Sequence, residues 1–487
     1  MKKIMGIGTI LLVLCAVIWW IIPVEQRKYG LTAGNLATDY TRLLPTKIER
    51  VEQATSREQL QQLVRQANAE GKKISIAGLQ HSQGGHTFFE DAIVLDMRSF
   101  NQVLAVDDVQ KTVKVEAGAT FDTIQQAIAP YGLALKVTQS QSIFTVGGSL
   151  SINAHGRDIR NGSMASNVEE LTLLTPTGDV EVLKKGDDKL RYVLGGYGLF
   201  GVMLDVTLSV TEDELYTMET DHMTARDYEV YFRNVQQDAD IVMHYARLSV
   251  APASFLEELY TVNYRRIESD EVLPVLADEQ LVKLRKAALD LGRQGGGYED
   301  LFWRIQSEHA NLQAGSIVSR NNVMRAESTF MEYTKPEKVE VLQEFFVPVE
   351  AFTDYVEALK DYMPANDRGH AVKVHNITVR YTARDELTQL NYATNDMLAL
   401  VVLIQHGVTD AEIAKATAFI RDWTDVTRAY GGTYYLPYYP YQTPEQFTAA
   451  YPNAREFADM KARLDPNTVF VNHFYDNYIK GLTANEN

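Results

Sequence analysis

Cysteine is almost absent: the 487 residues contain one, Cys15. A single cysteine cannot form an intrachain disulfide, so packing must stabilise the fold. The ten histidines are scattered, and no pair of His or Cys residues has metal-ligand spacing, so we predict no metal site. The sequence also lacks a G-x-S-x-G nucleophile elbow and a Walker phosphate loop. These absences argue against zinc, serine-hydrolase and P-loop chemistry.

Positive charge is also scarce. Lys and Arg number 47 against 64 Asp and Glu, which gives a formal net charge of -17. Recognition of a nucleic-acid backbone needs clustered Lys and Arg, so we expect no nucleic-acid partner. The composition, 45% hydrophobic and 23% charged, is that of a folded globular protein. A chain of this length predicts two domains, or one domain with a large insertion.

One long apolar run stands at the N-terminus. Ile4–Ile22 contains no charged residue, follows Lys2 and Lys3, and ends in paired tryptophans and a proline. Its length spans a hydrocarbon core, and tryptophans favour the membrane interface. No small-x-small cleavage site of a signal peptide is present. We therefore expect residues 1–24 to form a single-pass anchor in a bacterial inner membrane, with the nearly balanced flanking charges slightly favouring a periplasmic catalytic part.

The remaining sequence predicts an α+β protein. Ser56 and Gln59 form a capping-box pattern ahead of apolar residues at helical spacing, which predicts a helix ending at Gly71. Short alternating runs such as ISIA and TVKVE predict strands, and so do the later runs LQEFFVPV, NITVRYT and LALVVLIQH. The pattern of predicted helices and strands changes near Thr211. We predict domains at 43–212 and 213–440, with 441–487 returning to the first domain.

The first candidate motif is GLQHSQGGHTF, Gly78–Phe88, which follows the strand ISIA. Glycines let main-chain N–H groups approach a phosphate without interference from side chains. His81 and His86 are the reactive candidates in this loop. The alternative is an ordinary solvent-facing turn with incidental histidines.

The second motif is SIFTVGGSLSINAHG, Ser142–Gly156. Its small side chains allow the main chain to lie along an extended ligand, with hydroxyl and amide groups as hydrogen-bond partners. A helix packed through small residues is the alternative, which the paired glycines disfavour.

A third glycine cluster satisfies G-x-G-x-x-G through Gly196, Gly198 and Gly201. The dinucleotide-binding fingerprint requires a helix after the glycines. The run VMLDVTLSV that follows is an alternating, β-branched strand pattern, so we reject the Rossmann interpretation.

In this order and spacing, the three loops resemble the FAD-binding domain of the vanillyl-alcohol-oxidase (PCMH-type) superfamily. The resemblance is nearest to its aldonolactone and alditol oxidase and decaprenylphosphoryl-ribose oxidase branch. It implies a two-subdomain FAD-binding domain over 43–212 and a mixed α+β cap domain for substrate over 213–440.

The resemblance also implies which residues hold FAD. His81 lies in a G-x-x-H-S pattern that tethers FAD covalently in many members, and a histidine that only lines the pocket is the alternative. No cysteine precedes the second motif, which excludes a second, cysteinyl attachment. The implied cofactor-binding residues are Gly78, Leu79, Gln80, His81, Ser82, Thr145, Gly147, Gly148, Ser149, Asn153, His155, Gly156, Val202 and Asn472.

The second half carries the implied catalytic residues. Arg380 in NITVRYT matches an arginine that faces flavin and substrate in alditol oxidases, whereas Thr378 replaces their acidic residue. Tyr438 occupies the place of an active-site lysine in the decaprenylphosphoryl-ribose oxidases. The closing segment is similar to one in which a lysine and an asparagine lie near the flavin ring. The catalytic candidates are Arg380, His375, Tyr438 and Lys461, and the candidates for the base are His375, Tyr381, Tyr438 and His473.

The implied activity is oxidation of an alcohol carbon in a sugar, polyol or aldonolactone-like substrate, by hydride transfer to flavin N5. One alternative is the flavin oxidase half of a sugar epimerisation system. Another is a membrane-anchored binding module without catalysis. The electron acceptor is O2, a quinone or a carrier protein. Ala154 stands where the aldonolactone branch controls oxygen access, and alanine there favours a dehydrogenase.

Overall fold

The structure is a computed structural model that describes residues 30–32, 35–139, 141–268, 275–277, 282–326, 333, 335–363 and 372–482. The predicted anchor, residues 1–24, lies outside these ranges and stays a prediction. Within them, no helix combines the length and the apolar character that crossing a bilayer requires.

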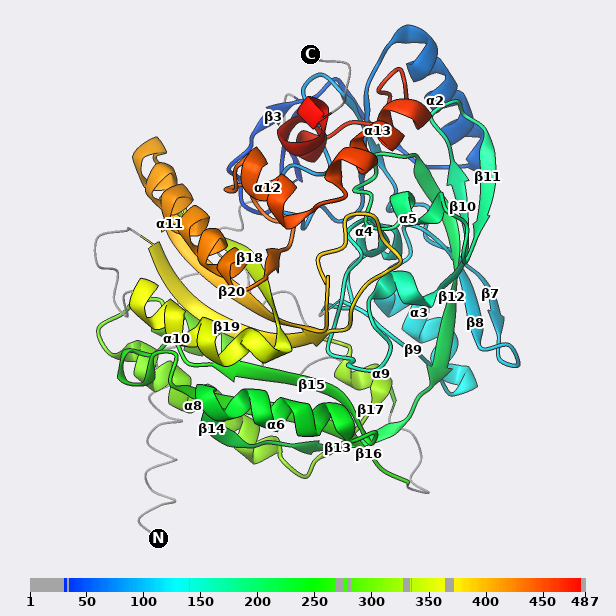
Figure 1. The fold of residues 1–487 in the computed structure, drawn as a ribbon. Helices are drawn as coiled ribbons and strands as arrows, with labels where there is room; N and C mark the ends of the chain where they lie inside the picture. The colour runs from blue at the N-terminus through cyan, green and yellow to red at the C-terminus, as the bar shows by residue number, and fades with distance from the viewer. Residues whose placement is uncertain are drawn as a thin grey trace.

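The first domain begins with two small sheets and one amphipathic helix (Figure 1). The helix confirms Ser56 as its N-cap, since the Ser56 side chain accepts from the Gln59 amide at 3.1 Å, and Gly71 ends the helix with a φ of 69°. The predicted capping box is only half formed, because the Gln59 side chain accepts from the Thr55 amide and not from that of Ser56. Its apolar face packs on the parallel sheet β4-β6-β5. The elements are β1 (Gly30–Thr32), β2 (Leu36–Thr38), β3 (Thr46–Lys47), β4 (Arg50–Gln53), α2 (Arg57–Glu70), β5 (Ile74–Ala77) and β6 (Ile93–Asp96).

A larger antiparallel sheet completes this domain, in the order β11-β10-β12-β8-β7 with β9 beside β12. Its long strand β12 starts directly after Gly201, so the expected strand is confirmed and no Rossmann helix follows these glycines. The elements are β7 (Val103–Asp107), β8 (Thr112–Glu116), α3 (Phe121–Ile128), β9 (Leu133–Leu135), α4 (Val146–Ser151), β10 (Val168–Leu174), β11 (Val180–Lys184), α5 (Leu190–Val193) and β12 (Val202–Glu212).

The second motif contains the packed helix that was its alternative interpretation, because Val146–Ser151 is the short helix α4. The preference against helix for Gly147 and Gly148 was therefore outweighed. Thr145 caps the helix by accepting from the Gly148 amide at 3.4 Å. The missing side chain of Gly147 lets the helix approach Ala117, whose Cβ would lie 2.9 Å from an added Cβ. Close packing decides the local structure here.

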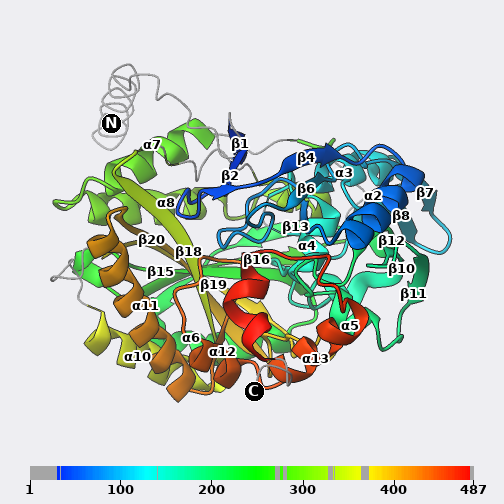
Figure 2. The same cartoon turned by 90° about the horizontal axis from the view of Figure 1, so that it is seen from above.

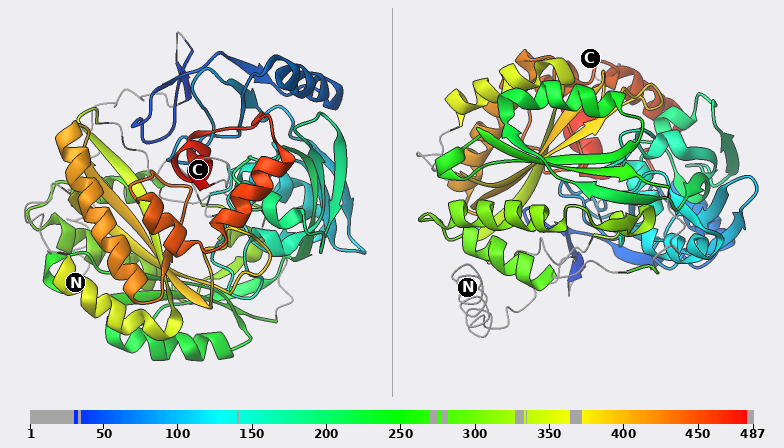
Figure 3. Two further views of the ribbon diagram at one scale, coloured as in Figure 1. Left: turned by 45° about the horizontal axis from the view of Figure 1, so that its top comes forward. Right: turned by 90° about the horizontal axis from the view of Figure 1, so that it is seen from below.

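The second half is built on a nine-stranded antiparallel sheet in the order β17-β13-β16-β15-β19-β20-β18-β21, with β14 beside β16. Helices α6, α10 and α11 pack on one face, and α7 and α8 lie across the other (Figure 3). The strands are β13 (Leu215–Glu219), β14 (His222–Thr224), β15 (Ile241–Leu248), β16 (Glu258–Arg266), β17 (Ile317–Ser319), β18 (Lys338–Pro348), β19 (Val372–Thr382), β20 (Met397–Gly407) and β21 (Thr433–Tyr434). The helices are α6 (Ala225–Gln237), α7 (Val282–Gly292), α8 (Tyr298–Gln313), α9 (Arg320–Val323), α10 (Phe352–Tyr362) and α11 (Asp410–Ala429).

After this sheet the chain crosses back to the first domain through α12 (Pro444–Ala450) and α13 (Ala454–Leu464) (Figure 2). Beyond α13, Val469–Val471 lies alongside β5. The Ile74 amide donates to the Val469 carbonyl at 2.7 Å, and the Val471 amide donates to the Ile74 carbonyl at 3.0 Å. The C-terminal segment is thus part of the layer that supports the loop after β5.

Candidate active site

A cavity of about 790 Å³ lies between the two halves. The loops after β5 and before α4 form its wall on the side of the first domain. The nine-stranded sheet and helices α7 and α8 form the remaining walls. A space of this size holds an extended small molecule.

Strand alternation selects the residues that the sheet contributes. Successive side chains of a strand point to opposite faces, so every second residue faces the cavity. On β19 these are Asn376, Thr378 and Arg380, and on β18 they are Leu342 and Glu344. The register aligns Arg247, Thr378, Val401 and Glu344 in one row across four strands. Residues distant in sequence therefore share one surface.

The loop after β5 places all five predicted cofactor residues of Gly78–Ser82 on the cavity. Gly78 has no room for a side chain, because an added Cβ would lie 2.5 Å from Thr145 Oγ1. The loop after β5 therefore packs directly on the cap of α4. Gln80 adopts a φ of 58°, a left-handed turn that an L side chain rarely takes.

His81 lies between two aromatic rings on this wall. Its ring stacks on Tyr40 at 5.9 Å between centroids and meets the edge of Phe144 at 5.1 Å. Burial lowers the pKa of His81 to about 4, so the imidazole is neutral near pH 7 and keeps a nitrogen lone pair. A neutral imidazole is the nucleophilic form that a covalent tether requires. The other motif histidine, His86, is buried and bonded to the Leu436 carbonyl at 3.1 Å.

The second motif contributes Thr145, Gly147, Gly148 and Ser149 to the cavity, as predicted. The Ser149 hydroxyl donates a hydrogen bond to Gln139 Oε1 at 2.6 Å. The two loops also offer polar atoms for a ligand: Ser82 Oγ and Gln141 Oε1 are buried without a hydrogen-bond partner among the described residues. Buried polar atoms normally have partners, so glycine-rich loops with spare polar groups fit a long cofactor such as FAD.

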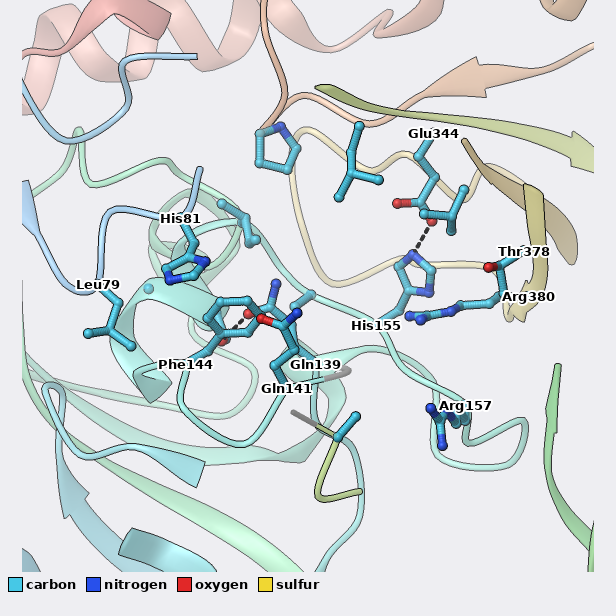
Figure 4. A pocket seen from close by; sticks show the side chains of 18 of the residues that line it. Leu79, His81, Gln139, Gln141, Phe144, His155, Arg157, Glu344, Thr378 and Arg380 are labelled. Atoms are coloured by element: carbon cyan, nitrogen blue, oxygen red, sulfur yellow. Dashed lines mark hydrogen bonds and ion pairs between the residues drawn. The ribbon is translucent and has the colours of Figure 1, made fainter. Parts of the chain in front are cut away.

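A polar cluster stands on the sheet side of the cavity (Figure 4). His155 Nε2 lies 2.7 Å from Glu344 Oε1, and the Tyr438 hydroxyl donates to Glu344 Oε2 at 3.2 Å. His155 Nδ1 is buried without a hydrogen-bond partner among the described residues. Burial, and then Glu344, raise the pKa of Tyr438 well above 10. Tyr438 is therefore a hydrogen-bond donor near pH 7 and not a base.

Arg380 joins this cluster from β19. Burial lowers the pKa of its guanidinium, and the nearby charge of Glu344 opposes that shift. The guanidinium stays a cation at neutral pH because the ordinary pKa of arginine is so high. Arg380 and His81 lie on opposite sides of the cavity, as Figure 4 shows. The predicted positions of Arg380 and Tyr438 on the cavity are thus observed.

Four predicted cofactor residues do not line the cavity. The Asn153 side chain donates to Asp385 Oδ2 at 3.0 Å and accepts from the Ala165 amide at 3.0 Å, so it fixes the chain after α4. Gly156 packs on the Thr138 carbonyl, 2.3 Å from an added Cβ. Val202 begins β12, and its side chain belongs to the apolar core that α2 also contacts. Its neighbours Gly201 and Met203 line the cavity instead. Asn472 donates to the His86 and Tyr197 carbonyls at 3.0 and 2.8 Å.

Lys461 also lies away from the cavity. Its Nζ is buried, donates to the Leu199 and Phe470 carbonyls at 2.8 Å each, and pairs with Asp465. Burial lowers the pKa of Lys461 to about 8, and Asp465 opposes the shift. This lysine joins α13 to the glycine-rich turn before β12, so its role is structural.

Three candidates for the base are also absent from the cavity wall: His375, Tyr381 and His473. A bulge between Val374 and Asn376 interrupts the register of β19, and His375 is buried outside the cavity wall, with its Nε2 3.9 Å from Glu340 Oε1. Burial is the largest cause that lowers the pKa of His375 to about 3. The Tyr381 hydroxyl accepts a hydrogen bond from the Gln236 side chain of α6. His473 Nε2 lies 2.9 Å from Thr46 Oγ1.

Five charged residues of the cavity were missed in the sequence: Glu344, Arg157, Arg247, Arg285 and Arg325. A charged residue inside the apolar strand LQEFFVPV was a usable signal, because buried charge concentrates at functional sites. Arg157 follows the second motif directly and was within reach of the same argument. Arg247 gave no comparable signal.

Comparison with known proteins agrees with this site. Residues 48–184 match a family model described as FAD binding domain, and residues 276–478 match one described as D-arabinono-1,4-lactone oxidase. L-gulono-1,4-lactone dehydrogenase of Mycobacterium tuberculosis is 24% identical over 86% of this chain and 93% of its own length. Decaprenylphosphoryl-beta-D-ribose oxidase of Mycolicibacterium smegmatis is 30% identical, but the match spans only 31% of this chain and 34% of that protein.

The fold has a solved counterpart. The crystal structure of 6-hydroxy-D-nicotine oxidase from Arthrobacter nicotinovorans covers 94% of this chain and 97% of its own, with a TM-score of 0.61 and 16% identity. That likeness concerns the fold alone. The two family models and the glycine-rich cavity support the same conclusion: this protein is an FAD-dependent oxidoreductase, and it is similar to the aldonolactone oxidases and dehydrogenases.

Proposed function

We propose that this protein oxidises an alcohol carbon of a sugar, polyol or aldonolactone-like substrate. The observation that carries the proposal is the pair His155–Glu344, which lies across the cavity from His81 in the loop after β5. Bound FAD supplies a hydride acceptor at flavin N5. The residues described below bind the substrate, orient it and take up its alcohol proton.

The proton acceptor is the His155–Glu344 pair. Tyr438 and Arg380 hold their protons near pH 7, which leaves the imidazole and the carboxylate as the groups of the cluster able to accept one. With Nε2–H donated to Glu344, Nδ1 of His155 carries the free lone pair. A carboxylate that orients a histidine and stabilises the imidazolium is a recurring arrangement in general-base catalysis. Tyr438 fixes the second oxygen of the same carboxylate.

Arg380 supplies positive charge beside this pair. A buried cation acts strongly because little water screens it, and it stabilises negative charge that develops on the reacting groups. Thr378 stands two residues earlier on the same strand and receives a hydrogen bond from Arg247 at 2.6 Å. Glu344, in the same row of the sheet, supplies the carboxylate that Thr378 lacks.

The covalent tether at His81 is part of the proposal. The ring lines the cavity in the loop that holds Gly78, is neutral near pH 7, and is fixed between two aromatic side chains. A yellow protein that keeps its colour in the pellet after acid precipitation has a covalent flavin. Colour in the supernatant means that the flavin is bound without a tether.

The electron acceptor is proposed to be a membrane quinone or a carrier protein. Ala154 is buried on the cavity wall, where its methyl group narrows the approach of oxygen. We propose also that residues 1–24 anchor the protein in one membrane, with the catalytic part periplasmic. Fractionation of cells that express the full chain, followed by protease treatment of spheroplasts, tests both the anchor and its orientation.

A substrate screen tests the activity. Purified protein is supplied with sugars, polyols and aldonolactones and an artificial electron acceptor, and product is followed by loss of the acceptor's colour. Turnover of one of these classes supports the proposal, and His155→Asn should abolish it while His375→Asn does not. A protein that contains FAD but oxidises no member of the three classes contradicts it. Peroxide production, measured in parallel, separates an oxidase from a dehydrogenase.

A further inference from the structure

The charge of the cavity is opposite to that of the protein. The chain carries a net charge of -17, yet among the described residues the charged ones that line the cavity are five arginines and one glutamate. The arginines are Arg157, Arg247, Arg285, Arg325 and Arg380. A concave site lined by one sign of charge concentrates ligands of the other sign.

Arg325 and Arg380 each have a carboxylate nearby. Arg325 pairs with Asp122 at 2.6 Å, and Arg380 lies beside Glu344. Among the described residues, Arg157 and Arg247 form no ion pair with a carboxylate. Their contacts are neutral: Arg157 donates to the Val323 carbonyl at 3.1 Å, and Arg247 donates to Thr378 Oγ1 at 2.6 Å.

Tyr245 holds the two guanidiniums near each other. Their central carbons lie 5.0 Å and 5.9 Å from the centroid of this ring, which keeps Arg157 and Arg247 within about 11 Å of each other. Arg285 reaches the same region from α7: burial lowers its pKa, and the charges of Arg247 and Arg157 lower it further. Three cations thus influence one another around a single tyrosine ring.

Holding like charges together costs free energy unless an anion joins them. The guanidinium group is the side chain best suited to oxyanions, because its planar N–H groups match a carboxylate or phosphoryl group in pairs. We propose that Arg157 and Arg247, assisted by Arg285, bind an oxyanionic group of the substrate, a carboxylate or a phosphoryl group. This inference rests on the proposed function, because it describes the far end of the molecule whose alcohol carbon is oxidised.

The position of the arginines separates this subsite from the cofactor loops. The loop Gly78–Ser82 and the start of α4 belong to the first domain. Arg247 and Arg285 belong to β15 and α7 of the second half, and Figure 4 shows Arg157 across the cavity from His81. The row Arg247, Thr378, Val401, Glu344 then runs from the anion subsite to the proposed base along one face of the sheet. A substrate held at Arg247 presents its hydroxyl carbons toward Glu344.

Calorimetric binding to the FAD-loaded protein tests the subsite without turnover. The probes are D-gluconate, D-glucose 6-phosphate and the neutral D-glucono-1,5-lactone. We expect at least one of the two anions to bind ten-fold or more tightly than the neutral lactone, with an affinity that falls as salt rises. Gluconate binding indicates a carboxylate subsite, and glucose 6-phosphate binding indicates a phosphoryl subsite.

Substitutions locate the binding. Arg157→Gln and Arg247→Gln should each weaken the anion about ten- to one-hundred-fold, because each removes charge-assisted hydrogen bonds. Arg384→Gln, which removes an exposed arginine outside the cavity, should leave it unchanged. The same proteins are checked for flavin content and for thermal unfolding.

Three results overturn the inference. The first is equal affinity for the lactone and both anions. The second is an Arg384→Gln effect as large as that of Arg247→Gln. The third is loss of FAD from Arg157→Gln or Arg247→Gln in a folded protein, which would assign these arginines to the cofactor. Anion binding that follows the expected pattern, in a protein that oxidises no sugar, supports the subsite and refutes the proposed function instead.

Discussion

Glu344→Gln isolates the role of the carboxylate beside His155. The amide keeps the size of the side chain and removes the negative charge that stabilises the imidazolium as the alcohol proton arrives. For charges roughly 4 Å apart at an effective dielectric constant of about 20, the attraction is about 4 kcal/mol. With the proton about half transferred in the transition state, about 2 kcal/mol is lost, so we expect flavin reduction to slow by about 30-fold.

The assay is anaerobic stopped-flow measurement of flavin reduction under saturating substrate. Because the pair acts on the chemical step, the reduction rate should fall while the substrate concentration at half-saturation stays nearly constant. His375→Asn is the matched control: this buried histidine lies beside Glu340 and outside the cavity wall, so the variant should reduce flavin at the normal rate. Normal reduction by Glu344→Gln, or equal loss in His375→Asn, would refute the assignment of the base.

Three further changes have defined outcomes. His81→Ala should bind FAD without a tether, so that acid releases the flavin, whereas wild type retains it; retention by the variant would exclude His81 as the attachment point. Ala154→Gly should raise the rate of peroxide formation about ten-fold by opening a path for oxygen, measured by oxygen uptake, and an unchanged rate argues against control at this position. Lys461→Met leaves Asp465 as a buried charge without its partner. This variant should lower the free energy of unfolding by about 3 kcal/mol, measured by urea titration, while the folded protein keeps its normal specific activity. Loss of activity without loss of stability would show that Lys461 acts in the active site.

Sequence patterns correctly predicted those helices and strands that local interactions determine. The helix α2 follows from its capping residue and its apolar spacing, and β12 follows from the alternation after Gly201. The glycine-rich loop at Gly78 was also placed correctly on a cavity. The helix α4 was only the alternative interpretation of its motif, and it forms because the cap at Thr145 and close packing on Ala117 outweigh the weak helix preference of glycine.

The residues of the catalytic cluster are close in space but far apart in the sequence, so their spacing in the sequence does not predict the cluster. Glu344 and Thr378 are 34 positions apart, yet they stand on either side of Val401 in one row of the sheet. Strand order and register decide that arrangement. His375 shows the same limit. The bulge between Val374 and Asn376 and the contact with Glu340 decide where its side chain lies, and sequence spacing predicts neither.

The polar side chains of the last segment show a second limit of prediction from sequence. The resemblance implies that Lys461 and Asn472 lie near the flavin ring. In the structure, both side chains donate their hydrogen bonds to main-chain carbonyls. A buried lysine or asparagine must find partners wherever it lies, so a matching residue type does not fix its role. Here those partners join the C-terminal segment to the turns before β12 and after β5.

The central claim is that a substrate in this cavity passes a hydride to bound FAD and a proton to the His155–Glu344 pair. One anaerobic titration tests it most directly: FAD-loaded protein is mixed with the substrate found by the screen, and the visible flavin band is followed to completion. The account predicts full bleaching, with one equivalent of substrate oxidised for each flavin, and a much slower course in His155→Asn. A flavin that the substrate leaves oxidised, but that dithionite bleaches at once, would contradict it.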